Sequence, residues 1–368
     1  MAGLTVLGHF DGRDLRAIQE AAGELGLEMN QVPVADAARD WVTSARPDVI
    51  LVQAEDPRAL TLSARLRLDP RLVGLPMLGV HVEPRALAFA LSLNLGLDDL
   101  VQAGQAHALV VRVREALRAT SVIPPASRGR AVVLEPDELR RAALERALKA
   151  AGYDVRFVDS SLELEALDLD QSISMLAVSG VSVEVAELLA RRRPSPEVPF
   201  VLSLDGREEA AARRALAALP RLRTLDLDAP PENVIFLVNE LENPQLVNKR
   251  ASPRELYGEA VRFRVAGQDQ EEVGYTYNVS TEGMFVRTLA PPTQAEIWLE
   301  LNAPRSMRCV RLEGSVMWRR PFRTTQRAVV PPGFGVKITD GSRRDLLLWI
   351  EGCGLPPSSL GLKAQPGS

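Results

Sequence analysis

The stretch NVSTEGMFVRT, residues 278–288, decides the fold of the last third of the chain. It places a polar turn ending in Gly283 between two short runs that suit β-strands. The same pattern of short strands separated by turn residues recurs around it, in AVRFRV (260–265), EIWLEL (296–301), CVRLEGSVMWRR (309–320) and GFGVKITD (333–340). We therefore expect an antiparallel barrel or sandwich in residues 244–353, closed by an amphipathic helix in SRRDLLLWIEGC, residues 342–353.

The first two thirds of the chain show a different pattern, in which short apolar strands alternate with amphipathic helices. Residues 1–120 repeat this alternation five times, and residues 130–243 repeat it again in the same order. Such alternation is typical of a parallel sheet with helices on both faces. We predict two doubly wound (βα)5 domains of flavodoxin or receiver type, joined by a linker at 121–129 and followed, after the barrel, by a disordered tail at 354–368.

Composition narrows the class of protein. Apolar residues make up 46% and charged residues 25% of the chain, and the net charge is −4. Residues 1–243 carry 27 basic and 36 acidic side chains, whereas residues 244–352 carry 16 and 12. This balance argues against a nucleic-acid partner but allows the basic part to attract a small anion. Two cysteines and three histidines exclude the usual Cys/His metal sites, and we expect a reduced, cytoplasmic protein without membrane insertion.

Two short motifs frame the start of the β-rich segment. RASPR, residues 250–254, has the form R-x-x-x-R, and NVSTEG, residues 278–283, has the form N-x-S-x-x-G. In this order, and with the strands that follow, they resemble the PilZ domain, a bacterial receptor for cyclic di-GMP and a β-barrel. The resemblance implies that Arg250, Arg254, Asn278 and Ser280 contact the ligand and that Gly283 shapes the turn. Many members have Asp where this chain has Asn278.

The chemistry of these residues suits a cyclic dinucleotide. Arginine can bridge phosphate oxygens bidentately, stack on a purine, or address guanine O6 and N7. Asn278 offers an amide oxygen to guanine donors and Ser280 a hydroxyl, while Gly283 permits a positive φ or a close backbone approach. Lys249 adds a cation by adjacency alone. The plainer reading makes the arginines solvated linker charges and the loop a capped turn. We expect four aromatic residues to belong to the core: Phe285, Trp298, Trp318 and Phe334.

The two (βα)5 domains resemble the receiver domains of response regulators but lack their phosphorylation residues; any small flavodoxin-type domain remains the alternative. A receiver needs acidic residues after its first strand, an aspartate ending the third, Thr or Ser ending the fourth and a Lys after the fifth. The phosphoacceptor position falls on Gln53 in the first domain and on Ser179 in the second. Glu135 and Asp137 follow the first strand of the second domain, yet no lysine follows its fifth. We therefore expect no phosphoacceptor.

These observations predict a non-enzymatic bacterial signalling effector with no cofactor. It would bind cyclic di-GMP through the PilZ-like barrel and relay the signal to protein partners, or through dimerisation, by way of its receiver-like domains. The alternative is a ligand-independent adaptor for motility or cell-polarity control, in which the same modules bind only proteins. No P-loop, zinc motif or Ser/His/Asp arrangement is present to support an enzyme.

Overall fold

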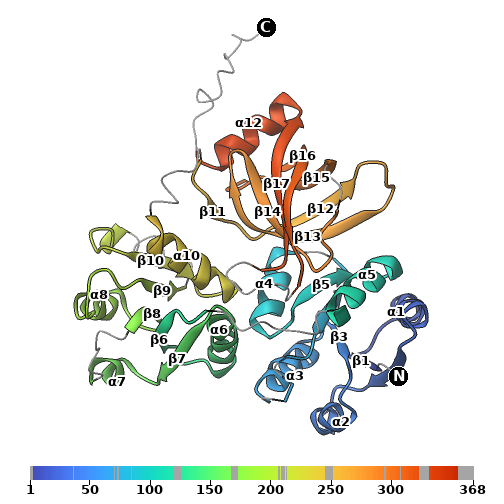
Figure 1. Cartoon of the computed structure of the whole chain (residues 1–368), viewed down its shortest axis with the longest axis horizontal. Helices are drawn as coiled ribbons and strands as arrows, with labels where there is room; N and C mark the ends of the chain where they lie inside the picture. The colour runs from blue at the N-terminus through green and yellow to red at the C-terminus, as the bar shows by residue number, and fades with distance from the viewer. Residues whose placement is uncertain are drawn as a thin grey trace.

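The computed structural model shows three folded units (Figure 1). It describes residues 3–35, 37–69, 71–72, 74–83, 85–118, 126–166, 173–205, 208, 212, 214–244, 252–293, 296–306, 308–322 and 331–354. Two α/β domains lie beside each other, and a β-barrel sits across both of them (Figure 1). The predicted fold class is confirmed: two parallel five-stranded sheets precede an antiparallel barrel that ends in a helix.

The first α/β domain has the strand order β2-β1-β3-β4-β5, all parallel. Its apolar runs form the buried centre, as in VILV at 49–52, where all four residues are buried. Its strands are β1 (Gly3–Leu7), β2 (Glu28–Val32), β3 (Val49–Gln53), β4 (Met77–His81) and β5 (Asp99–Gln102). Its helices are α1 (Gly12–Leu25), α2 (Ala37–Ala45), α3 (Pro57–Arg67), α4 (Ala86–Asn94) and α5 (Ala106–Arg118).

The second α/β domain repeats this topology, with the strand order β7-β6-β8-β9-β10. Its strands are β6 (Gly129–Leu134), β7 (Tyr153–Val158), β8 (Ile173–Ser179), β9 (Phe200–Leu204) and β10 (Leu222–Asp226). The helices with described bounds are α6 (Glu138–Ala150), α7 (Ser161–Ala166), α8 (Val183–Arg191) and α10 (Glu232–Glu242). A helix is also predicted between β9 and β10, and residues 208, 212, 214 and 215 are helical there, while residues 209–211 and 213 lie outside the described residues.

The barrel closes because β13 pairs with β12 along its first half and with β14 along its second. The ring then runs β12-β15-β16-β17-β14-β13, and β11 adds to the end of β13. Its strands are β11 (Glu255–Leu256), β12 (Ala260–Val265), β13 (Glu271–Ser280), β14 (Gly283–Arg287), β15 (Glu296–Asn302), β16 (Cys309–Arg320) and β17 (Gly333–Gly341). Helix α12 (Arg343–Gly352) covers one end, where fully buried Trp349 donates its indole N–H to the carbonyl of Ser280 at 3.0 Å.

The outward face of β13 attaches the barrel to both α/β domains. Tyr275 stacks on Phe89 of α4, with ring centroids 3.7 Å apart and an interplanar angle of 5°. Two residues later, Tyr277 meets Phe236 of α10 edge-on at 5.7 Å and donates to the carbonyl of Glu232 at 2.8 Å. Each tyrosine belongs to the hydrophobic core of a different α/β domain. One strand therefore joins all three units.

A buried guanidinium reinforces the contact with the first α/β domain. Arg112 of α5 is 1% exposed and lies 3.1 Å from a carboxylate oxygen of Asp99 and 3.1 Å from one of Glu272. It also donates to the carbonyl of Val273 at 2.6 Å. Asp99 in turn accepts the backbone N–H of Leu289 at 2.8 Å. Removing one partner of such a network would leave a buried charge uncompensated, which is strongly destabilising, so the network favours the docked arrangement.

The same interface predicts a dependence of stability on pH. Burial lowers the pKa of His81 to about 4, and its Nε2 lies 3.2 Å from the hydroxyl of Tyr275. The unfolded state, with a histidine pKa of about 6.5, takes up the proton first. The contribution of neutral, buried His81 to the free energy of unfolding is therefore complete above pH 6.5 and is lost as pH falls toward 4. Urea unfolding should show a loss of about 3 kcal/mol over this window that is missing in His81→Gln. Parallel pH profiles of the two proteins would contradict the assignment.

Candidate functional site

The turn between β13 and β14 is built by a close approach of two strands. Asn278, 6% exposed, pairs with Phe285, and the hydroxyl of Ser280 donates to the carbonyl of Gly283 at 3.3 Å. A Cβ on Gly283 would lie 2.1 Å from the carbonyl oxygen of Val336 on β17. Gly283 does not have a positive φ. The glycine is therefore required for close packing of β14 on β17, the second of the two reasons that the sequence suggested.

The structure brings Arg254 to this turn. A cavity of about 200 Å³, here called the motif cavity, is lined by Arg254 together with residues of β13, β14, β16 and β17. The lining residues are Arg254, Asn278, Ser280, Glu282, Gly283, Met284, Phe285, Met317, Trp318, Gly335, Val336 and Lys337. Four of the five predicted contact and shape residues thus line one hollow. Arg250, like the adjacent Lys249, lies outside the described residues.

The expectation that four aromatic residues belong to the core is right for two of them. Phe285 and Phe334 are 2% and 0% exposed, but Trp298 and Trp318 are 39% and 42% exposed. A register shift of β16 between Val316 and Trp318 accompanies the exposure of the second indole. Tryptophan is apolar by composition, and no local sequence pattern marks such a register shift.

Two neighbouring residues hold the ring of Trp318 at the motif cavity. Its ring stacks on Phe285, with centroids 5.0 Å apart and an interplanar angle of 21°. A Cβ on Gly335, which pairs with Trp318 across β16 and β17, would lie only 2.4 Å from the indole nitrogen. Phe285 and the bare backbone of Gly335 therefore hold the indole in place. The pairing of Gly335 with Trp318 is a sequence signal, but it can be recognised only when the register of β16 against β17 is known.

An aromatic path leads from the motif cavity to the second α/β domain. Phe285 lies between Trp318 and Tyr277, whose ring centroid is 6.0 Å away. Tyr277 then contacts α10 as described above. Alongside it, the buried guanidinium of Arg287 lies 3.3 Å from a carboxylate oxygen of Glu232 and 5.2 Å from the ring centre of Phe89. The wall of the cavity is thus continuous with the junction of the three units.

The phosphoacceptor positions of the receiver-like domains carry no carboxylate. Gln53 ends β3 and accepts the backbone N–H of His9 at 3.0 Å. Ser179 ends β8 and donates to Glu135 at 2.7 Å, and Arg140 lies 3.1 Å from the same carboxylate oxygen. Asp137 caps α6. Within the described ranges, no group of three His, Cys, Asp or Glu side chains is arranged to hold a metal ion.

Comparison with known proteins supports the reading of the C-terminal domain. Residues 248–352 match the family model of the PilZ domain, which confirms the resemblance seen in the motifs. No protein among the curated ones matches the chain. None of the described helices is long and apolar enough to cross a membrane.

Several solved structures are similar in fold. A putative response regulator from Chloroflexus aurantiacus J-10-fl is 19% identical over 32% of this chain and 99% of its own, with a TM-score of 0.30. A putative two-component system response regulator/GGDEF domain protein is 15% identical over 68% of this chain and 100% of its own, with a TM-score of 0.29. The PilZ domain of CeSA from a cellulose-synthesizing bacterium is 12% identical over 27% of this chain and 95% of its own, with a TM-score of 0.21.

The close approach at Gly283 predicts the effect of a single methyl group. In Gly283→Ala, the added Cβ would collide with backbone of β17, which cannot rotate away as a side chain would. We expect a loss of about 1–3 kcal/mol in the free energy of unfolding by urea. Gly258→Ala is the control, because no atom lies within 4 Å of its added Cβ, and it should change stability by less than about 0.5 kcal/mol. Equal stability of the two variants would refute the packing role.

Proposed function

We propose that this chain is a non-enzymatic signalling effector whose barrel binds cyclic di-GMP in the motif cavity. The observation that carries the proposal is the meeting of Arg254 with Asn278 and Ser280, which are distant in sequence, around one hollow that also presents an exposed indole. The match of residues 248–352 to the PilZ domain supports the same ligand class.

The ligand offers two phosphates and two guanines, and the motif cavity has a complementary group for each kind. Arg254 supplies a guanidinium for phosphate oxygens or for the Hoogsteen edge of a guanine. Trp318 supplies a flat surface on which a purine can stack, fixed from behind by Phe285. Asn278 supplies an amide oxygen for the N–H donors of guanine. Its bond is neutral where an Asp would make a charge-assisted one, so each such contact contributes less.

Signal transmission in this proposal runs from the cavity into the two receiver-like domains. A base that packs on Trp318 presses on Phe285, and Phe285 contacts Tyr277, which is inserted against α10. A ligand that favours one arrangement of this junction shifts its population. The receiver-like domains, with Gln53 and Ser179 at the phosphoacceptor positions, then present the change to protein partners in the bacterial cytoplasm without being phosphorylated.

The first test of the proposal removes the guanidinium of Arg254. Isothermal titration calorimetry of the full chain with cyclic di-GMP should show binding, and Arg254→Ala should weaken it by about tenfold to hundredfold, because a hydrogen bond to a charged group contributes about 1.5–3 kcal/mol. Arg308→Ala is the matched control, because Arg308 is an exposed arginine of the same barrel that does not line the motif cavity. Absence of binding by the unmodified protein would refute the proposal and favour the ligand-independent adaptor.

The second test separates the two exposed tryptophans. Trp318→Ala should weaken binding of cyclic di-GMP by about 1–3 kcal/mol, the usual contribution of a base stacked on an aromatic side chain. Trp298→Ala removes an indole of similar exposure that lies on another face of the barrel, over Arg264, and should leave affinity unchanged. Isothermal titration calorimetry of the two variants measures this difference. Equal losses in both variants would argue against stacking at Trp318.

A further inference from the structure

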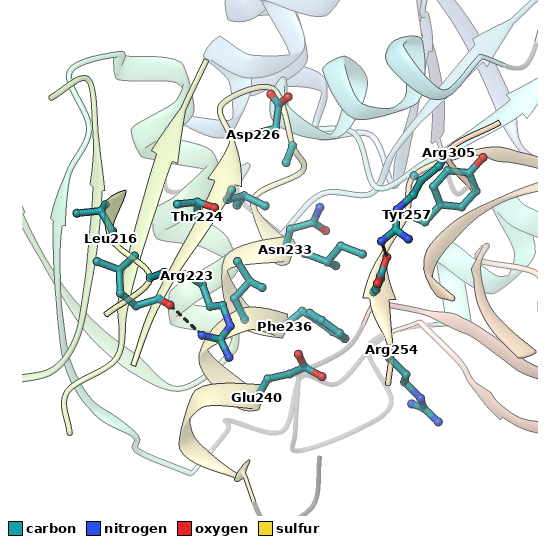
Figure 2. A pocket seen from close by; sticks show the side chains of 18 of the residues that line it. Leu216, Arg223, Thr224, Asp226, Asn233, Phe236, Glu240, Arg254, Tyr257 and Arg305 are labelled. Atoms are coloured by element: carbon teal, nitrogen blue, oxygen red, sulfur yellow. Dashed lines mark hydrogen bonds and ion pairs between the residues drawn. The ribbon is translucent and has the colours of Figure 1, made fainter. Parts of the chain in front are cut away.

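A second and larger hollow lies between the barrel and the second α/β domain (Figure 2). This interdomain cavity has a volume of about 650 Å³. Its walls come from β10 and α10 on one side and from the start of β11 and Arg305 on the other. The lining includes Arg223 of β10, Phe236 and Glu240 of α10, and Arg254, Glu255 and Arg305 on the side of the barrel.

Arg254 belongs to both cavities, so the two meet at this side chain. Figure 2 shows Arg254 at the start of β11, with its guanidinium directed away from the labelled side chains of the second α/β domain. Arg223, Phe236 and Glu240 lie toward the same end of the interdomain cavity as Arg254 (Figure 2). A ligand that engages Arg254 from the motif cavity therefore lies next to the interdomain cavity.

The two volumes decide how much of the proposed ligand each cavity can hold. Pockets for ligands of drug size measure about 300–1,000 Å³. Cyclic di-GMP, with two purines, two riboses and two phosphates, is larger than most such ligands, whereas the motif cavity measures about 200 Å³. It has room for one base beside Trp318, with the adjoining phosphate at Arg254. Past Arg254 lies the interdomain cavity, which the same side chain lines and which has room for the rest of the ligand.

The chemistry of the interdomain cavity suits a guanine. The Watson–Crick edge of guanine presents N–H donors, which a carboxylate accepts, and its Hoogsteen edge presents O6 and N7, which a guanidinium addresses. Glu240 of α10 is half-buried and Arg223 of β10 is exposed, and both line the cavity together with the apolar ring of Phe236. A further guanidinium, that of Arg305, is already paired with Glu255 and forms part of the opposite wall.

We infer that the second half of the bound cyclic dinucleotide occupies the interdomain cavity, with Glu240 and Arg223 of the second α/β domain reading its guanine. The inference rests on the proposed function and adds a partner to it: a receiver-like domain is itself part of the binding site. The ligand then bridges β11 of the barrel and α10. Binding couples directly to the packing of the two units, because only the docked arrangement offers both halves of the site.

The test is calorimetry of the full chain with cyclic di-GMP. Glu240→Ala and Arg223→Ala should each weaken binding by about tenfold to hundredfold, as expected for lost hydrogen bonds to charged groups. The controls are Glu187→Ala and Arg191→Ala, which remove an exposed ion pair on α8 of the same domain, away from both cavities. Their affinities should equal that of the unmodified protein. Arg223 is exposed, so its variant keeps the test valid even if Glu240→Ala lowers stability.

A second ligand, cyclic GMP-AMP, tests the proposed contact between Glu240 and the guanine. Cyclic GMP-AMP can place its guanine in the motif cavity and its adenine in the interdomain cavity, where adenine lacks the donors that Glu240 accepts. The unmodified protein should prefer cyclic di-GMP over this hybrid by about tenfold or more. The preference should shrink toward unity in Glu240→Ala and persist in Glu187→Ala.

The outcomes separate the inference from the function on which it rests. Binding by the unmodified protein that is lost in Arg254→Ala but unchanged in Glu240→Ala and Arg223→Ala would overturn the inference and leave the proposed function standing. Absence of binding by the unmodified protein would overturn both. Weakening in both second-domain variants, with unchanged controls, would support the shared site.

Discussion

The burial of two tyrosines on one strand is the constraint on which the arrangement of the molecule depends. Tyr275 and Tyr277 both point out of the barrel, so a free barrel would expose two large rings next to each other. The structure buries each ring in a different α/β domain. Large aromatic rings dominate the free energy of such contacts. The barrel therefore acts as the part that fixes the two receiver-like domains relative to each other.

The turn that lines the motif cavity follows the two tyrosines on the same strand. β13 carries the tyrosines and then, after a register shift between Thr276 and Asn278, the residues of the motif cavity. The shift adds one residue, so that Asn278 faces the cavity beside Phe285 although Tyr277 has just pointed outward. A bulge re-aims the side chain without ending the strand. Any displacement of Asn278 is consequently carried by the same backbone that positions Tyr277 against α10.

Sequence patterns were sufficient where a local rule decides the structure. Strand and helix periods identified both (βα)5 domains, and two motifs identified the residues around the turn, because Gly283 and Ser280 act on neighbouring backbone. They failed for Trp318, whose exposure follows from a register shift and a glycine on the neighbouring strand. They also gave no sign of Arg112, which reads as one more helix arginine until Asp99 and Glu272 enclose it. Both depend on contacts between distant segments.

One contact in the docking of the barrel involves His81, the last residue of β4. His81 ends β4, where the receiver resemblance places the Thr or Ser that senses the phosphate. Here its imidazole is buried and hydrogen-bonded to Tyr275 of the barrel. A small hydroxyl would leave this space unfilled and Tyr275 without a partner. The residue that ends β4 of the first α/β domain is thus in direct contact with β13 of the barrel.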